Sequence, residues 1–176
     1  MDKYLLATEY YVHAGEQNSD RVLDTVSNYL KNNHIHIDHI VISSTTGFTA
    51  YKAIESLLKF SRNIIICKQD LNEKYSMNKN VMDEICRYAT IVDIPKQFLK
   101  NKIGSKTVNI LRQFSEGTKV CIELALYLID NSYVNSNEKI LVVAGTLKGA
   151  DTSLTLFVNP DKSFKVMNFL AFPEGR

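Results

Sequence analysis

The chain has 176 residues, of which 45% are hydrophobic and 23% charged, and these values favour one globular domain spanning residues 1–176. A net charge of +2, with lysines and arginines scattered along the chain, argues against a nucleic-acid partner. No apolar run reaches eighteen residues and three isolated cysteines form no CxxC pair, so we expect a cytoplasmic protein with reduced thiols and no membrane span.

The first third of the sequence alternates short β-branched runs with longer runs whose apolar residues recur at helical spacing. These runs predict strands over residues 9–13, 40–43 and 63–67 and helices over residues 20–31 and 49–58. The run at 63–67, Asn-Ile-Ile-Ile-Cys, is typical of strands that are buried on both faces. The alternation predicts an α/β layered domain with right-handed crossovers.

The rest of the chain continues this pattern with more interruptions. The polar stretch at 68–79 follows a predicted strand, and it fits either a ligand-binding loop or a surface excursion. Gly104 is expected to break the segment before the next helix. Further helices are predicted over residues 81–88, 105–114 and 118–129, and further strands over residues 90–92, 139–144, 153–158 and 166–172.

Three histidines that lie close together, His34, His36 and His39, raise the question of a metal site. On an extended chain the first two share one face and His39 takes the other. No acidic or cysteine residue lies beside them at a regular spacing. We therefore interpret them as solvated loop histidines and predict no metal.

The stretch Ser44–Ala50 lies between a predicted strand and a predicted helix. Such a junction directs free backbone N–H groups at an anion, and the helix N-terminus carries partial positive charge. The hydroxyls that can add donors belong to Ser44, Thr45, Thr46 and Thr49. The same stretch also fits an ordinary helix N-cap with a glycine turn and no ligand.

A second glycine-containing stretch, Gly145–Thr152, follows the strand predicted at 139–144. Its two glycines permit backbone N–H groups to approach an anion closely, and Lys148 adds positive charge. The stretch matches neither the P-loop pattern GxxxxGK[ST] nor the dinucleotide-binding pattern GxGxxG. A tight hairpin between two strands is the alternative interpretation.

The helix predicted at 118–129 is apolar except for one stripe formed by Glu123, Tyr127 and Asp130. The default interpretation of such a stripe is a narrow solvent-facing surface. The alternative is a polar pocket in which a partly buried carboxylate such as Glu123 acts as an acid or base. We expect the solvent-facing arrangement.

Several of these stretches resemble a known family. The segment 44–50 resembles the effector-phosphate loop in the C-terminal domain of pyruvate kinase, and Gly145–Thr152 is similar to that domain's second, glycine-rich effector loop. Together with Gly15–Asn18 and Gly117–Glu123, they resemble stand-alone archaeal and bacterial pyruvate kinase alpha/beta domain proteins. The resemblance covers most of the chain.

The resemblance implies a three-layer α/β/α sandwich with a mostly parallel five-stranded sheet. It also implies a phosphorylated small-molecule ligand, and flavin mononucleotide (FMN) is the ligand expected first. The implied binding residues are Asn18, Ser44, Thr45, Thr46, Gly47, Phe48, Thr49, Gly145, Thr146, Lys148, Gly149, Asp151 and Thr152. No enzymatic activity is implied, because the chemistry of pyruvate kinase lies in a barrel domain that a chain of this length cannot contain.

The sequence departs from the family at two places. Family members carry a longer segment with a His-Gly tract in the region that corresponds to Lys68–Glu116. Phe48 replaces the basic residue that pyruvate kinase offers in its own loop, which lowers the expected phosphate affinity. An aromatic ring at this position could instead pack on a planar ligand.

Two other functions use the same predicted pocket. One is a small flavin- or phosphate-directed enzyme with Glu123, Asp130 or Asp151 as the acid or base. The other is a regulatory protein whose ligand tunes the assembly of a homo-oligomer. The sequence pairs no nucleophile with a base, so we expect a binding module first.

Overall fold

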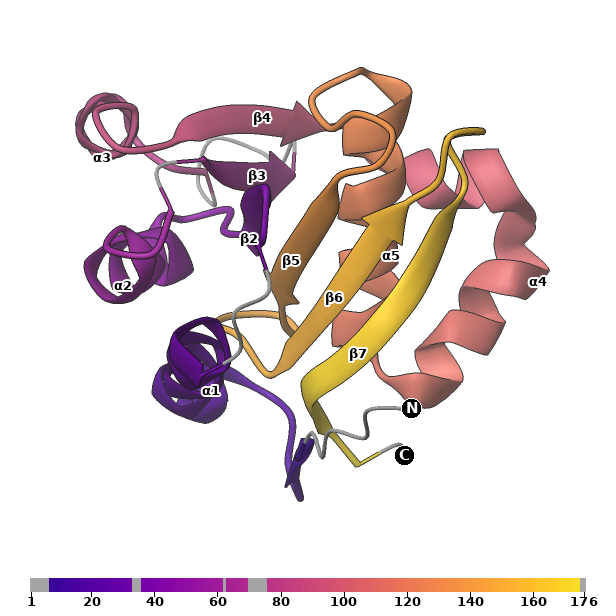
Figure 1. The fold of residues 1–176 in the computed structure, drawn as a ribbon, viewed down its shortest axis with the longest axis horizontal. Coiled ribbons are helices and arrows are strands. Elements are labelled where there is room, and N and C mark those ends of the chain that lie inside the picture. Colours follow the sequence, from indigo (N-terminus) through magenta and orange to yellow (C-terminus); the bar gives the residue numbers. More distant parts are fainter. Residues whose placement is uncertain (1–6, 33–35, 62, 70–75, 175–176) are drawn as a thin grey trace.

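The computed structural model describes residues 7–32, 36–61, 63–69 and 76–174, and over these residues it forms an α/β fold with a seven-stranded sheet and five α-helices (Figure 1). The strands are β1 (Glu9–Tyr11), β2 (His39–Ser43), β3 (Ile64–Gln69), β4 (Thr90–Ile94), β5 (Lys139–Ala144), β6 (Thr152–Val158) and β7 (Phe164–Pro173). The helices are α1 (Ser19–Asn32), α2 (Phe48–Leu57), α3 (Lys79–Ile85), α4 (Phe98–Phe114) and α5 (Glu116–Asp130). A 3-10 turn, Glu16–Asn18, precedes α1.

The sheet has the strand order β1-β7-β6-β5-β2-β3-β4. Strands β5, β2, β3 and β4 run parallel, β1 runs parallel to β7, and β6 runs antiparallel to both of its neighbours. The expectation of a five-stranded sheet, which came from the resemblance, is therefore wrong. Every extended run predicted from the residues themselves joins this one sheet, so the sheet has two more strands.

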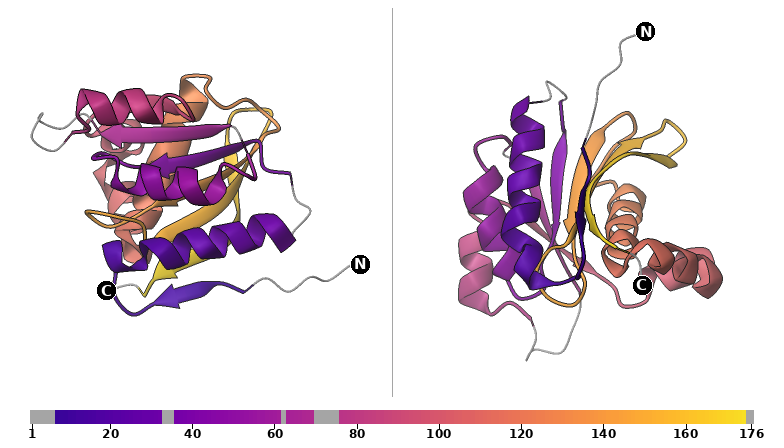
Figure 2. Two further views of the ribbon diagram at one scale, coloured as in Figure 1. Left: turned by 90° about the vertical axis from the view of Figure 1, so that its left-hand side faces the viewer. Right: turned by 90° about the horizontal axis from the view of Figure 1, so that it is seen from below.

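The helices cover both faces of the sheet, with α1, α2 and α3 on one side and α4 and α5 on the other (Figure 2). The central strands alternate their apolar side chains between these two layers. In β2, for example, Ile40 and Ile42 pack in the α1–α2 core, whereas Val41 packs in the α5 core. Burial on both faces explains why the strands are continuous apolar runs.

The polar stripe of α5 is buried at Glu123 and exposed at Asp130, so the solvent-facing expectation is wrong for Glu123. Helix α4 packs over the stripe and supplies a partner for each member. Glu123 is 2% exposed and accepts a hydrogen bond from Leu99 N at 3.2 Å. Phe98 packs edge-on against Tyr127, and Lys102 forms an ion pair with Asp130 at 2.6 Å. The predicted break at Gly104 lies inside α4, where its φ of 79° and ψ of 154° interrupt the helix.

Some expectations concern residues that lie wholly or partly outside the described ones. His34 and the centre of the polar stretch 68–79 are among these. In the described residues, no group of three histidine, cysteine, aspartate or glutamate side chains could hold a metal ion. Nor does any helix in the described part of the chain combine the length and hydrophobicity that a membrane crossing requires.

Candidate ligand-binding cleft

The sheet topology brings the two glycine-containing loops together. Strands β2 and β5 are parallel neighbours, with Ile42 opposite Val143, so both strands end at the same edge of the sheet. The loop after β2 continues into α2, and the loop after β5 turns back into β6. The expectation that the two loops meet at one edge of the sheet is thus confirmed, and residues of both loops line one cavity. The second loop is also the hairpin considered as its alternative.

The cleft at this edge consists of three adjoining compartments. The amide compartment, at the N-terminus of α2, has a volume of about 460 Å³ and is lined by both loops. The central compartment, about 660 Å³, lies between the β5–β6 loop and α5. The carboxamide compartment, about 290 Å³, lies between α4, α5 and the end of β3 and is named for Gln69 and Gln97. Adjacent compartments share lining residues, and Gln69 lines all three. Their volumes are typical of small-molecule sites.

The first turn of α2 has four N–H groups that lack an acceptor inside the helix. One of them, Ala50 N, donates a hydrogen bond to Ser44 Oγ at 3.0 Å, and the first hydrogen bond inside the helix runs from Tyr51 N to Gly47 O at 3.0 Å. The other three amides belong to Gly47, Phe48 and Thr49, and no acceptor for any of them is found among the described residues; of the three residues, Phe48 and Thr49 line the amide compartment. Two donors with a favourable helix-end field therefore lie beside the amide compartment.

The Thr49 side chain offers a third donor at the amide compartment. The residue is only 3% exposed, and it lines the amide compartment. Its hydroxyl has no hydrogen-bond partner among the described residues, and the oxygen itself is not fully buried, so it is accessible from the compartment. A ligand acceptor in the amide compartment would satisfy the Thr49 hydroxyl and the two amides together.

The positive charge near α2 comes from lysines that lie over the Phe48 ring. Lys148 Nζ is 4.7 Å from the ring centroid and Lys52 Nζ is 5.3 Å from it. Each lysine is also paired with a carboxylate: Lys148 Nζ lies 2.5 Å from Glu16 Oε2, and Lys52 pairs with Asp20. The Phe48 ring therefore makes cation–π contacts with two lysines near the start of α2. The carboxylates paired with these lysines partly neutralise their positive charge.

The polar groups beneath the β5–β6 loop form hydrogen bonds within the protein. Asp151 is fully buried, and its Oδ2 accepts hydrogen bonds from Gly15 N at 3.0 Å and Thr146 N at 2.9 Å. Its Oδ1 accepts a hydrogen bond from the Thr152 hydroxyl at 2.7 Å. Asn18 donates to His13 O. Of the residues predicted in this region, Asn18, Asp151 and Thr152 support the loop and do not line the cleft.

Close packing explains the glycine at position 149. Its φ is +81°, and a Cβ atom there would lie 2.4 Å from Glu16 Cα and 2.5 Å from Ser19 Oγ. Ser19 Oγ in turn accepts a hydrogen bond from Ala150 N at 2.9 Å. The glycine thus lets the loop pack closely on the start of α1.

Apolar side chains form much of the central compartment. They include Cys67, Ile94, Val120, Leu124 and Leu147. Leu147 is fully exposed and has a φ of 64°, so it stands at the tip of the loop beside the opening. Burial raises the pKa of the Cys67 thiol well above its usual range, so Cys67 is a neutral wall of the cleft and not a nucleophile.

The carboxamide compartment contains an ion pair between Lys119 and Glu123, of which only Glu123 was singled out from the sequence. Lys119 Nζ lies 2.7 Å from Glu123 Oε2, and both side chains are largely buried. Arg112 forms a second pair with Glu116 at 2.7 Å. Lys119 and Glu123 are four residues apart on one helix, and this spacing could have revealed the pair. Gln69 and Gln97 carry no motif and could not have been identified in this way.

The three proposed acid–base residues all have structural partners. Glu123 accepts hydrogen bonds from the α4 backbone and from Lys119, and Asp130 forms an ion pair with Lys102. Asp151 accepts a hydrogen bond from the backbone of the β5–β6 loop. No protein-family model matches the sequence. The geometry of the cleft is therefore the main guide to function.

Proposed function

We propose that this protein binds a phosphate-bearing small molecule, with the phosphate at the N-terminus of α2. The observation that carries the proposal is the set of three donors at the amide compartment: the N–H groups of Phe48 and Thr49 and the Thr49 hydroxyl. Phosphate oxygens accept several hydrogen bonds at once and are favoured by the helix dipole.

FMN is the specific ligand that we propose. The resemblance to the stand-alone pyruvate kinase alpha/beta domain proteins supports it, and so does the shape of the cleft. The amide and central compartments adjoin, so a ligand can place its phosphate in one and an apolar ring in the other. The aliphatic side chains of the central compartment suit a ring of this kind.

Lys148 supplies a charged contact in this proposal. Its side chain is 59% exposed, so it can turn from Glu16 to a phosphate in the amide compartment at little cost. The preference of Lys148 for the phosphate over Glu16 then sets part of the affinity.

Titration calorimetry with FMN, riboflavin and inorganic phosphate tests the proposal, together with the visible spectrum of the protein as purified. We expect FMN to bind and riboflavin, which lacks the phosphate, to bind at least about tenfold more weakly, since at least two charge-assisted hydrogen bonds are lost. Equal affinities for FMN and riboflavin would contradict a phosphate site. If inorganic phosphate bound and FMN did not, flavin would be rejected as the ligand, whereas the proposed anion site would be retained.

A charge-reversal variant locates the phosphate. Thr46 is exposed at the amide compartment, so Thr46→Glu places a carboxylate beside the proposed phosphate and should weaken FMN binding at least about tenfold. Thr107→Glu is the matched control, because Thr107 is also exposed but lies on α4 and lines none of the three compartments. Equal weakening by both substitutions would show that the phosphate does not lie at α2.

A further inference from the structure

We infer that the carboxamide compartment recognises the far end of the ligand, and that this end is a neutral planar ring whose edge carries amide N–H and C=O groups. The inference rests on the proposed phosphate site and extends it from an anion site to a class of ligand: phosphate monoesters with such a ring. It depends on the side chains of the carboxamide compartment, which Thr49 does not line.

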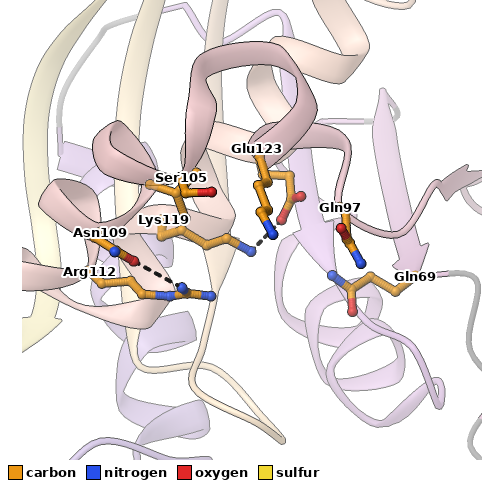
Figure 3. A pocket seen from close by; sticks show the side chains of 9 residues that line it. Gln69, Gln97, Ser105, Asn109, Arg112, Lys119 and Glu123 are labelled. Atoms are coloured by element: carbon orange, nitrogen blue, oxygen red, sulfur yellow. Dashed lines mark hydrogen bonds and ion pairs between the residues drawn. The ribbon is translucent and has the colours of Figure 1, made fainter.

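Two carboxamide side chains, those of Gln69 and Gln97, line the carboxamide compartment. They come from the end of β3 and the start of α4, and their carboxamides point toward one another across the compartment (Figure 3). Neither carboxamide has a hydrogen-bond partner among the described residues. Each offers two N–H donors and one carbonyl acceptor. Together they can pair with adjacent N–H and C=O groups on one ring edge.

Lys119 and Glu123 form an ion pair in the same compartment. The Lys119 ammonium has three donors, of which the short contact to Glu123 uses one. Glu116 Oε1 lies 3.8 Å from the ammonium, which is too far for a good hydrogen bond. Lys119 therefore keeps donors for a ligand carbonyl, and the Glu123 oxygens keep lone pairs for a ligand N–H.

The paired charges of the compartment favour a neutral group with donors and acceptors over a second phosphate. Lys119 and Arg112 are each paired with a glutamate, which leaves the exposed Lys100 as the one lining cation with no carboxylate partner among the described residues. A dianion placed there would lie within reach of Glu116 and Glu123 as well as the cations, whereas a neutral group with donors and acceptors meets both. The α2 end, by contrast, presents only donors at Phe48 and Thr49.

The space between the two ends suits the plane of a ring. The central compartment joins the other two and has apolar walls from β3, β4 and α5, including Cys67, Ile94 and Leu124. A planar heterocycle can pack its faces on these side chains and direct its polar edge to the carboxamides. The cleft therefore offers places for a phosphate, a ring and a polar ring edge in three compartments that share lining residues.

Comparing ligands by titration calorimetry tests this inference. The probes are FMN and uridine monophosphate, which carry both groups, fructose 1,6-bisphosphate, which carries two phosphates, and inorganic phosphate. We expect FMN or uridine monophosphate to bind at least about tenfold more tightly than inorganic phosphate and more tightly than the bisphosphate. Tighter binding of the bisphosphate, or equal binding of all phosphates, would overturn the inference and leave the phosphate site standing. Failure of every phosphate, including inorganic phosphate, would overturn the proposed function itself.

A glycine substitution tests the residue that forms the far end. Gln97 has a φ of 61°, a conformation that glycine adopts freely, so Gln97→Gly removes the carboxamide without straining the fold. Lys162→Gly is the matched control, because Lys162 has a φ of 64° in the β6–β7 turn. We expect Gln97→Gly to weaken the tighter-binding ring ligand about fivefold and to leave the affinity for inorganic phosphate unchanged. An unchanged affinity for the ring ligand, or an equal loss in Lys162→Gly, would overturn the assignment.

Discussion

The β2–α2 loop and the β5–β6 loop have similar compositions and opposite uses. Both contain glycine and threonine, both leave the same edge of the sheet, and both line the amide compartment. In the β5–β6 loop, the amides of Thr146 and Ala150 donate to Asp151 and Ser19. In the β2–α2 loop, the amides of Phe48 and Thr49 have no such acceptors among the described residues.

This difference shows that glycine and threonine content alone does not identify an anion site. What matters is whether the loop's N–H groups already have partners in the fold. The hairpin loop packs on α1 through Gly149, and its Thr146 and Ala150 amides have acceptors inside the fold, whereas the N-terminus of α2 leaves the amides of Phe48 and Thr49 beside the cleft without one among the described residues. One loop is thus a support and the other is the proposed binding element.

The largest effect is expected from removing the support. Asp151→Ala leaves the N–H groups of Gly15 and Thr146 and the Thr152 hydroxyl without their acceptor in a buried place. We expect the free energy of unfolding to fall by about 3 kcal/mol, measured by urea denaturation.

Asp161→Ala is the control for this substitution. Asp161 lies in the other hairpin turn, where hydrogen bonds from Ser163 hold the pKa of its carboxyl below the usual range. The residue is exposed, so its removal should cost much less than that of Asp151. A loss in Asp151→Ala no larger than in Asp161→Ala would contradict a supporting role for the β5–β6 loop.

A smaller effect is expected at the start of α2. Ser44→Ala removes the acceptor of Ala50 N, the third amide of the helix, and should lower the free energy of unfolding by about 1 kcal/mol. The same variant should retain FMN binding, because the N–H groups of Phe48 and Thr49 remain. Loss of FMN binding with unchanged stability would instead place the Ser44 hydroxyl on the ligand. Thermal denaturation and titration calorimetry measure the two properties separately.

The smallest effects are expected at the Glu16–Lys148 pair, and they have opposite signs. Glu16→Gln removes the carboxylate that competes for Lys148, so FMN affinity should rise about threefold, within the range of an exposed ion pair. Lys148→Met should lower the affinity by a similar factor. Both effects should shrink at high salt. Changes of the same sign in the two variants would show that Lys148 does not contact the phosphate.

Local patterns in the sequence were enough for the strands, for most of the helices and for the edge of the sheet at which the two loops meet. The apolar runs at 40–43, 63–67 and 139–144 predicted the central strands, and their parallel order put both loops at one edge. The solvent-facing expectation for Glu123 failed because the Gly104 break hid the full length of α4, which begins at Phe98 and covers the stripe.

The roles of individual site residues depended on contacts that no local pattern encodes. Asp151 has a partner at Gly15, 136 positions away in the chain, so its supporting role became visible only in the fold. Gln69 and Gln97 approach from different elements, and neither residue type is distinctive. The i, i+4 spacing of Lys119 and Glu123 was visible in the sequence, but its burial was not.

The most direct test of the account is an amide nuclear magnetic resonance titration with inorganic phosphate and FMN. The account predicts that the N–H resonances of Phe48 and Thr49 show the largest downfield shifts with both ligands, because they gain an anionic acceptor. The resonances of Thr146 and Ala150, which already have acceptors, should change little. Saturation by either ligand with Phe48 and Thr49 unchanged would contradict a phosphate site at α2.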